Sequence, residues 1–179
     1  MTTEYLLDRE VDAVLRALTP ENRRVMQVSL HTGSRVSDVL ELRTAQVQKS
    51  SRFWVTEKKT GKRRMIGLPA ALRADLLEHA GEVWVFENRL DPMKHRSRQA
   101  VWKDVKRAAV AFRLPQNVAP HSFRKVYAVD LLKQCGDIKK VQRALNHGNI
   151  ETTIIYAAAA QLLAAKGTKK AARVGKRFR

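Results

Sequence analysis

Apolar side chains recur every three or four residues along most of the chain, the spacing that places them on one face of a helix. Asp8 is positioned to cap a first helix, and Pro20 to open a second. Gly33 interrupts the pattern, which resumes between Arg35 and Leu42. Further helices are predicted from Pro69, over 98–112, over 120–132, and over 138–145 behind Asp137 as its cap.

Two short runs depart from the helical spacing. Phe53–Thr56 and Met65–Leu68 are rich in β-prone residues and are separated by a polar turn that contains Gly61. This arrangement predicts an antiparallel β-hairpin. The expected fold is therefore mainly α with a small antiparallel sheet, an α+β class.

The predicted helix over 98–112 has two unlike faces. Its apolar set is expected to face the core: Val101, Trp102, Val105, Ala108, Ala109 and Phe112. Lys103, Lys106 and Arg107 lie opposite that set. Such a cationic face is suited to lie along a phosphate backbone.

The net charge of the chain indicates the kind of partner that it binds. The 179 residues include 35 Lys and Arg against 17 Asp and Glu, a net charge of +18. A polyanion is the expected partner, and nucleic acid is favoured over an anionic membrane surface. The length predicts one domain over 1–165 and a basic flexible tail over 166–179, which has seven cations and no acid. The single Cys135 and the lack of a signal peptide or spanning segment predict a soluble, cytoplasmic protein.

Five elements of sequence combine phosphate-binding and proton-transferring side chains. They are Thr32-Gly33-Ser34-Arg35, Asp38, His121-Ser122-Phe123-Arg124, Leu145-Asn146-His147-Gly148 and Tyr156. Arginine grips phosphate oxygens bidentately, histidine moves protons near neutral pH, and a tyrosine oxygen can act as a covalent nucleophile. Together these residues suggest phosphodiester chemistry.

The set resembles the active site of tyrosine recombinases, the phage-integrase family, over residues 6–165. The resemblance implies that Arg35 and Arg124 clamp the scissile phosphate, that His121 assists proton movement on the nucleophile, and that Tyr156 is the nucleophile. His147 is expected to hydrogen-bond the phosphate, with Asn146 in place of the family's usual Gly. Asp38 stands where the family usually has Glu and is expected to support Arg35.

The resemblance also implies a general acid on the hairpin, a lysine that protonates the leaving 5′-oxygen. Lys59 fits this position, and its neighbour Lys58 remains an alternative because strand register is not visible from sequence. Tyr127 is the alternative nucleophile, although it follows the helical apolar period. The side chains expected to contact DNA are Lys58, Lys62, Arg63, Arg64, Lys103, Lys106 and Arg107.

The implied function is site-specific recombination through a 3′-phosphotyrosyl intermediate, on double-stranded DNA, by a tetramer on paired sites. No metal or other cofactor is expected, because the covalent link conserves the phosphodiester energy, and the sequence has neither a Walker-type phosphate loop nor a cluster of acids typical of a two-metal nuclease. A catalytically silent DNA-binding accessory protein and a type IB topoisomerase-like relaxing enzyme are the alternatives. The resemblance covers only the family's catalytic domain and not its usual N-terminal DNA-clamping domain, so the sequence is expected to be either an excised catalytic domain or a natural short recombinase. The predicted helix after Tyr156 is expected to pack either on its own domain or on a neighbouring protomer.

Overall fold

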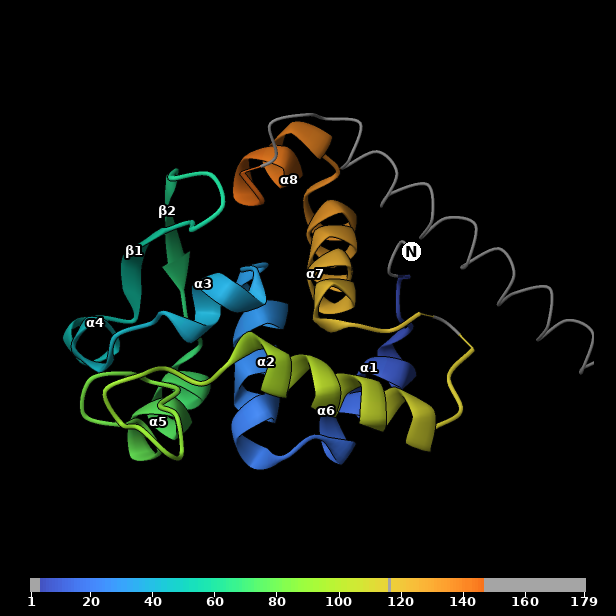
Figure 1. The fold of residues 1–179 in the computed structure, drawn as a ribbon. Helices are drawn as coiled ribbons and strands as arrows, with labels where there is room; N and C mark the ends of the chain where they lie inside the picture. The colour runs from blue at the N-terminus through green and yellow to red at the C-terminus, as the bar shows by residue number, and fades with distance from the viewer. Residues whose placement is uncertain (1–3, 116, 147–179) are drawn as a thin grey trace, which may run out of the picture. The chain divides into compact units, whose positions relative to one another are not determined.

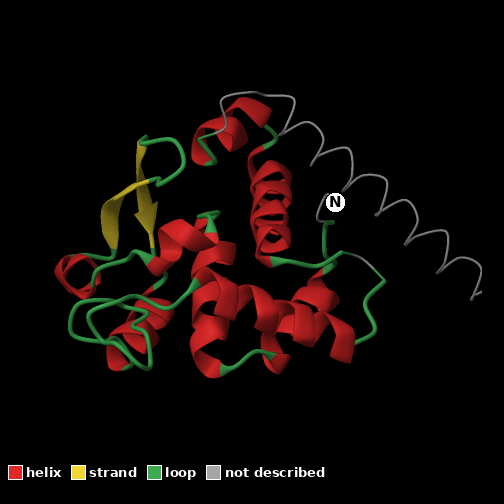
Figure 2. Cartoon of the chain, viewed as in Figure 1, coloured by secondary structure: helices red, strands yellow, loops and turns green. Residues whose placement is uncertain are grey.

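Helices make up most of the described chain, as predicted. The computed structural model describes residues 4–115 and 117–146. Figure 1 shows the elements along the chain, and Figure 2 separates the helices from the two-stranded hairpin. In order they are α1 (Asp8–Ala17), α2 (Pro20–Thr32), α3 (Val36–Leu40), α4 (Thr44–Lys49), β1 (Arg52–Thr56), β2 (Arg63–Gly67), α5 (Ala70–Glu78), α6 (Arg98–Ala111), α7 (Pro120–Cys135) and α8 (Ile138–Ala144).

The helix ends follow their local sequence, with one correction. Asp8 is the first residue of α1 and not its cap, and the amide of Leu7 is instead bound by the Glu10 carboxylate at 2.8 Å. Pro20 opens α2 as predicted. Asp137 caps α8 as predicted, because its side chain accepts the amides of Lys139 and Lys140.

The hairpin pairs β1 with β2 in antiparallel register, with Trp54 opposite Met65. Along β1 the side chains alternate, so that Phe53 and Val55 are buried while Trp54 is half exposed. The polar turn predicted between the strands is present, and Gly61 adopts a positive φ of 68° within it. The predicted hairpin is therefore confirmed.

The core of residues 4–127 is organised around α2, which packs against α1, α3, α5 and α6. Val25, Met26 and Val28 of α2 are fully buried, as are Val101 and Val105 of α6. The chain divides into two compact units at 127/128, and the second contains the end of α7 and α8 among its described residues. Within the described ranges, none of the helices combines the length and apolar character that crossing a bilayer requires.

One prediction for α6 is wrong in part. Val101, Val105, Ala108 and Ala109 are buried as expected, but Trp102 and Phe112 are 44% and 47% exposed. Helical period places Trp102 beside the core positions, yet its ring lies at the edge of the apolar stripe. This exposure brings Trp102 to a pocket described below.

Candidate active site

The site is built around the turn that ends α2. Gly33 caps this helix with φ 65°, a left-handed conformation that favours glycine, and its amide donates to the Ser29 carbonyl at 2.8 Å. Thr32 and Ser34 on either side are bound to each other through their hydroxyls at 2.8 Å. The turn is therefore rigidly fixed immediately before Arg35.

Two arginines from distant elements bind this turn. Arg124 of α7 is 1% exposed, and its Nη1 donates to the Gly33 carbonyl at 2.5 Å. Arg64 of β2 donates to the Thr32 carbonyl at 2.9 Å and to the Ser34 hydroxyl at 2.6 Å. The segments 32–35 and 121–124 are thereby joined to the hairpin at one point.

Arg35 precedes α3 and faces two carboxylates. Its Nη1 lies 2.5 Å from Oε2 of Glu57 and 3.9 Å from Oδ2 of Asp38. The expected pair with Asp38 is present, but Glu57, 22 residues along the chain, makes the hydrogen bond. Asp38 uses its other oxygen, Oδ1, to accept the Lys58 amide at 3.1 Å.

The two carboxylates respond oppositely to this environment. Burial raises the pKa of Asp38, more than the Lys58 amide and the nearby arginines lower it. Burial also opposes ionisation of Glu57, but hydrogen bonds from Arg35 and Thr60 outweigh it and hold the pKa of Glu57 below its usual value. Glu57 is therefore the carboxylate that stays ionised most strongly beside Arg35.

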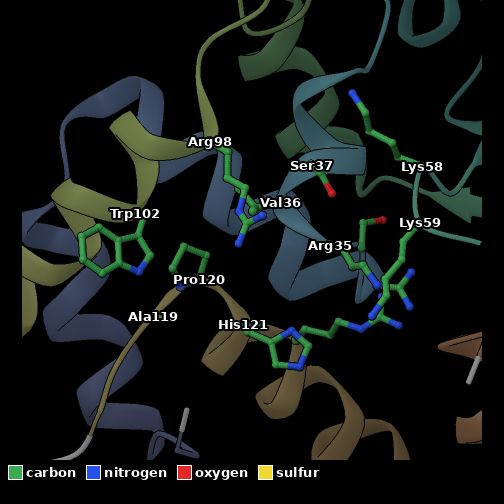
Figure 3. Close-up of a pocket in the computed structure, with 12 residues that line it drawn as sticks. Arg35, Val36, Ser37, Lys58, Lys59, Arg98, Trp102, Ala119, Pro120 and His121 are labelled. Atoms are coloured by element: carbon green, nitrogen blue, oxygen red, sulfur yellow. The ribbon is translucent and has the colours of Figure 1, made fainter. Parts of the chain in front are cut away.

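The hairpin lysines differ in their partners. The ammonium of Lys58 is paired with Glu41, which raises the pKa of Lys58. In Figure 3 the Lys58 side chain extends away from Arg35, whereas Lys59 turns toward it. The geometry thus favours Lys59 over Lys58 for a role at the site, and the role itself stays a prediction.

These side chains surround one pocket of about 560 Å³ (Figure 3). Arg35, Lys58, Lys59, His121 and Arg124 all line it, although they lie in three separate segments of the sequence. His121 is exposed at the start of α7. Arg98 and Trp102 of α6 form another part of the lining. The pocket is open and cationic, which suits a single phosphodiester group.

Two predicted site residues fall outside the described residues. His147 and Tyr156 belong to the segment 147–179, so their placement and roles stay predictions. The predicted boundary between a domain over 1–165 and a tail over 166–179 lies in the same segment.

The side chains predicted to contact DNA occupy different environments. Lys62, Arg63 and Lys103 are exposed, and Arg63 lies over the Trp54 ring at 5.3 Å. Arg64 is largely buried, with its side chain 10% exposed. Lys106 donates to Asn117 Oδ1 at 2.6 Å, and Arg107 pairs with Asp104. For these residues DNA contact remains a prediction, and Arg64 and Arg107 also make intramolecular contacts that their sequence positions did not indicate.

Sequence reasoning missed Glu57. It is the only acid between 52 and 67, and this isolation within a basic hairpin was the available signal. Asp75, Glu78 and His79 form a cluster of metal-ligand type among the described residues, but none of the three lines the pocket.

Comparison with known proteins places this site in context. Residues 4–162 match the phage integrase family. A tyrosine recombinase of Thermosipho africanus (strain TCF52B) is 30% identical over 162 residues, which cover 86% of this chain and 56% of that protein. This chain thus spans little more than half the length of that relative.

Solved structures agree in fold. The catalytic domain of bacteriophage HP1 integrase matches with a TM-score of 0.65 at 19% identity, over 88% of this chain and 89% of that one. A lambda integrase tetramer bound to a Holliday junction matches with a TM-score of 0.70 at 20% identity, over 87% of this chain and 48% of that one. The predicted fold class is confirmed.

Proposed function

Because the chain belongs to the phage integrase family, we propose that it is the catalytic domain of a site-specific DNA recombinase that cleaves and rejoins strands through Tyr156. One observation carries most of this proposal. Four of the predicted catalytic residues, from three separate sequence segments, line one cationic pocket: Arg35, Lys59, His121 and Arg124.

In the proposed reaction the Tyr156 oxygen attacks the scissile phosphorus and the bond from phosphorus to the 5′-oxygen breaks. His121 takes part in moving the tyrosyl proton, and Lys59 gives a proton to the leaving 5′-oxygen. Arg35 and Arg124 stabilise the negative charge of the pentacoordinate phosphate, with His147 hydrogen-bonded to it. A 5′-hydroxyl of a second strand then attacks the phosphotyrosine, the bond from phosphorus to the Tyr156 oxygen breaks, and the tyrosine hydroxyl is regenerated as a new phosphodiester forms. Since the covalent link conserves the bond energy, the proposal includes neither a metal nor a nucleotide cofactor.

The proposed partner is double-stranded DNA. Supporting this are the net charge of +18 and the match to a lambda integrase tetramer that was solved on a Holliday junction. We extend the proposal to assembly as a tetramer on paired sites and to action in the cytoplasm, associated with the nucleoid when bound to DNA.

A nicked suicide duplex tests the reaction, because loss of the short strand traps the covalent intermediate. On the cognate site we expect a protein–DNA adduct that is abolished by Tyr156→Phe and retained by Tyr127→Phe. An adduct that persists in Tyr156→Phe would reject the nucleophile assignment. Salt-sensitive binding without an adduct would favour the silent accessory protein. Relaxation of supercoiled plasmid that needs no paired sites would favour the topoisomerase-like alternative.

A further inference from the structure

Glu57 is a fully buried carboxylate immediately after β1, with a side chain that is 0% exposed. Three groups surround it. Arg35 Nη1 donates to Oε2 at 2.5 Å, the Thr60 hydroxyl donates to the same oxygen at 2.8 Å, and Arg64 Nε lies 3.5 Å from Oε1. A buried charge is costly unless it is paired, so this position is built to hold an anion between arginines.

The contact with Glu57 determines which donors of Arg35 remain for a ligand. Nη1 serves both carboxylates, at 2.5 Å to Glu57 and 3.9 Å to Asp38. Among the described residues, Nε and Nη2 of Arg35 make no hydrogen bond, and this side chain is 20% exposed at the pocket. One edge of the planar guanidinium is therefore fixed to the protein while the other can bind phosphate oxygens.

Glu57 also anchors the turn that carries Lys59. Its backbone carbonyl accepts the amide of Gly61 at 2.8 Å and that of Thr60 at 3.3 Å, and its amide donates to the Lys62 carbonyl at 2.9 Å. With the Thr60 hydroxyl on its carboxylate, the residue is bonded to the turn through both backbone and side chain. Arg35 and the predicted general acid are thus connected through one residue.

The net charge of the site gives a second reason for a carboxylate here. Arg35, Arg64 and Arg124 bring three positive charges together, and Asp38 and Glu57 are the acids that act on them. Without Glu57, the guanidinium of Arg35 would keep only the longer contact to Asp38.

We propose that Glu57 is a positioning residue for phosphate cleavage, which orients the Arg35 guanidinium so that its free edge faces the scissile phosphate. This inference rests on the proposed function and adds to it a residue outside the motifs that resemble the family. Glu57 touches no reacting atom, and it acts through Arg35.

A charge-specific substrate pair separates this role from simple stabilisation of the fold. The first suicide duplex has a normal scissile phosphodiester, and the second has a methylphosphonate, which lacks the negative charge that Arg35 would bind. We expect Glu57→Gln to slow adduct formation on the phosphodiester by roughly 10- to 100-fold, since small displacements of a catalytic group have effects of this size. On the methylphosphonate the loss should shrink to about threefold or less, because a misplaced guanidinium matters little to a neutral group.

Asp104→Asn is the matched control. It removes another buried carboxylate that is paired with an arginine, but at a position that does not line the pocket. Any loss of activity it causes should be equal on the two substrates.

The outcomes distinguish the two proposals. If the wild-type protein forms no adduct on either substrate, the proposed function fails. If the wild-type protein does form an adduct, and Glu57→Gln either matches its rate or loses rate equally on both substrates, only the positioning role is overturned. Should Glu57→Gln fail to fold, Glu57→Asp, which keeps the charge but draws it back from Arg35, is measured in the same way. A loss confined to the phosphodiester supports the role, and an equal loss on both substrates overturns it.

Discussion

At the scale of single residues, the two hairpin lysines invite a direct comparison. Both line the pocket, but Lys59 turns toward Arg35, whereas the Lys58 ammonium is paired with Glu41. We expect Lys59→Ala to slow cleavage of a phosphodiester by about a hundredfold or more, as loss of a general acid does. A substrate with sulfur at the 5′-bridging position should recover most of this rate, because a thiolate leaves without a proton. Rates of adduct formation on the two substrates measure the effect.

The same measurement on Lys58→Ala decides between the neighbours. A modest loss that sulfur does not recover is expected, since the Lys58 ammonium is paired with Glu41 and its side chain extends away from Arg35. A large loss in Lys58→Ala that the sulfur substrate recovers, with little change in Lys59→Ala, would transfer the general acid to Lys58.

Residue-level prediction from sequence relied on short motifs, and their roles in the reaction stay predictions. Arg35, His121 and Arg124 were found from local spacing, and the structure brings them to one pocket. Glu57 could not be found in this way, because its partner Arg35 is 22 residues distant and the contact depends on how β1 approaches α3. The largely buried side chain of Arg64 was missed for the same reason, since a basic residue in a basic strand is expected to lie at the surface.

At the scale of elements, Asp104 joins the start of α2 to α6. Its Oδ2 accepts from the Thr19 amide at 2.9 Å and from Asn22 Nδ2 at 2.8 Å, and its Oδ1 accepts from Arg107 Nη2 at 2.6 Å. The residue is 8% exposed. We expect Asp104→Asn to lower the free energy of unfolding by about 3 kcal/mol, because several donors lose a buried charged acceptor at once. Urea unfolding measures this, with exposed Asp12→Asn as a control that should leave stability unchanged.

The pH dependence of that difference follows from the pKa of Asp104. Burial alone would raise this pKa, but hydrogen bonds from Asn22, Thr19 and Arg107 outweigh burial and lower it. A carboxylate whose pKa is lower when folded stabilises the protein fully above its unfolded pKa, about 3.9, and loses this contribution as the pH falls through the folded pKa. The stability difference between wild type and Asp104→Asn should therefore close below about pH 4. A difference that stays constant down to pH 3 would show that ionisation of Asp104 is not its source.

Element prediction succeeded for the hairpin and the longer helices, whose periods extend over many residues. It missed α4 (Thr44–Lys49), which spans six residues and has too few turns to show a period. It also predicted Trp102 to be buried, because a periodic pattern identifies the apolar face of a helix but not how far neighbouring elements pack over that face. Trp102 is instead partly exposed and lines the pocket.

At the scale of the whole molecule, the charge of +18 makes salt dependence a measure of which cations meet DNA. The logarithm of the binding constant falls with the logarithm of salt concentration, with a slope of about 0.9 for each phosphate contact. Lys62, Arg63 and Lys103 are exposed, and replacing any one of them with Ala should reduce the slope by about one.

Arg107 differs because its guanidinium is paired with Asp104 and donates to the Ala17 carbonyl at 2.5 Å. Arg107→Ala should leave the slope unchanged and lower stability instead. Fluorescence anisotropy between roughly 50 and 200 mM salt measures the slopes. A reduction for Arg107→Ala equal to that for Lys103→Ala would show that the whole cationic face of α6 lies on the phosphate backbone, as the sequence pattern predicted.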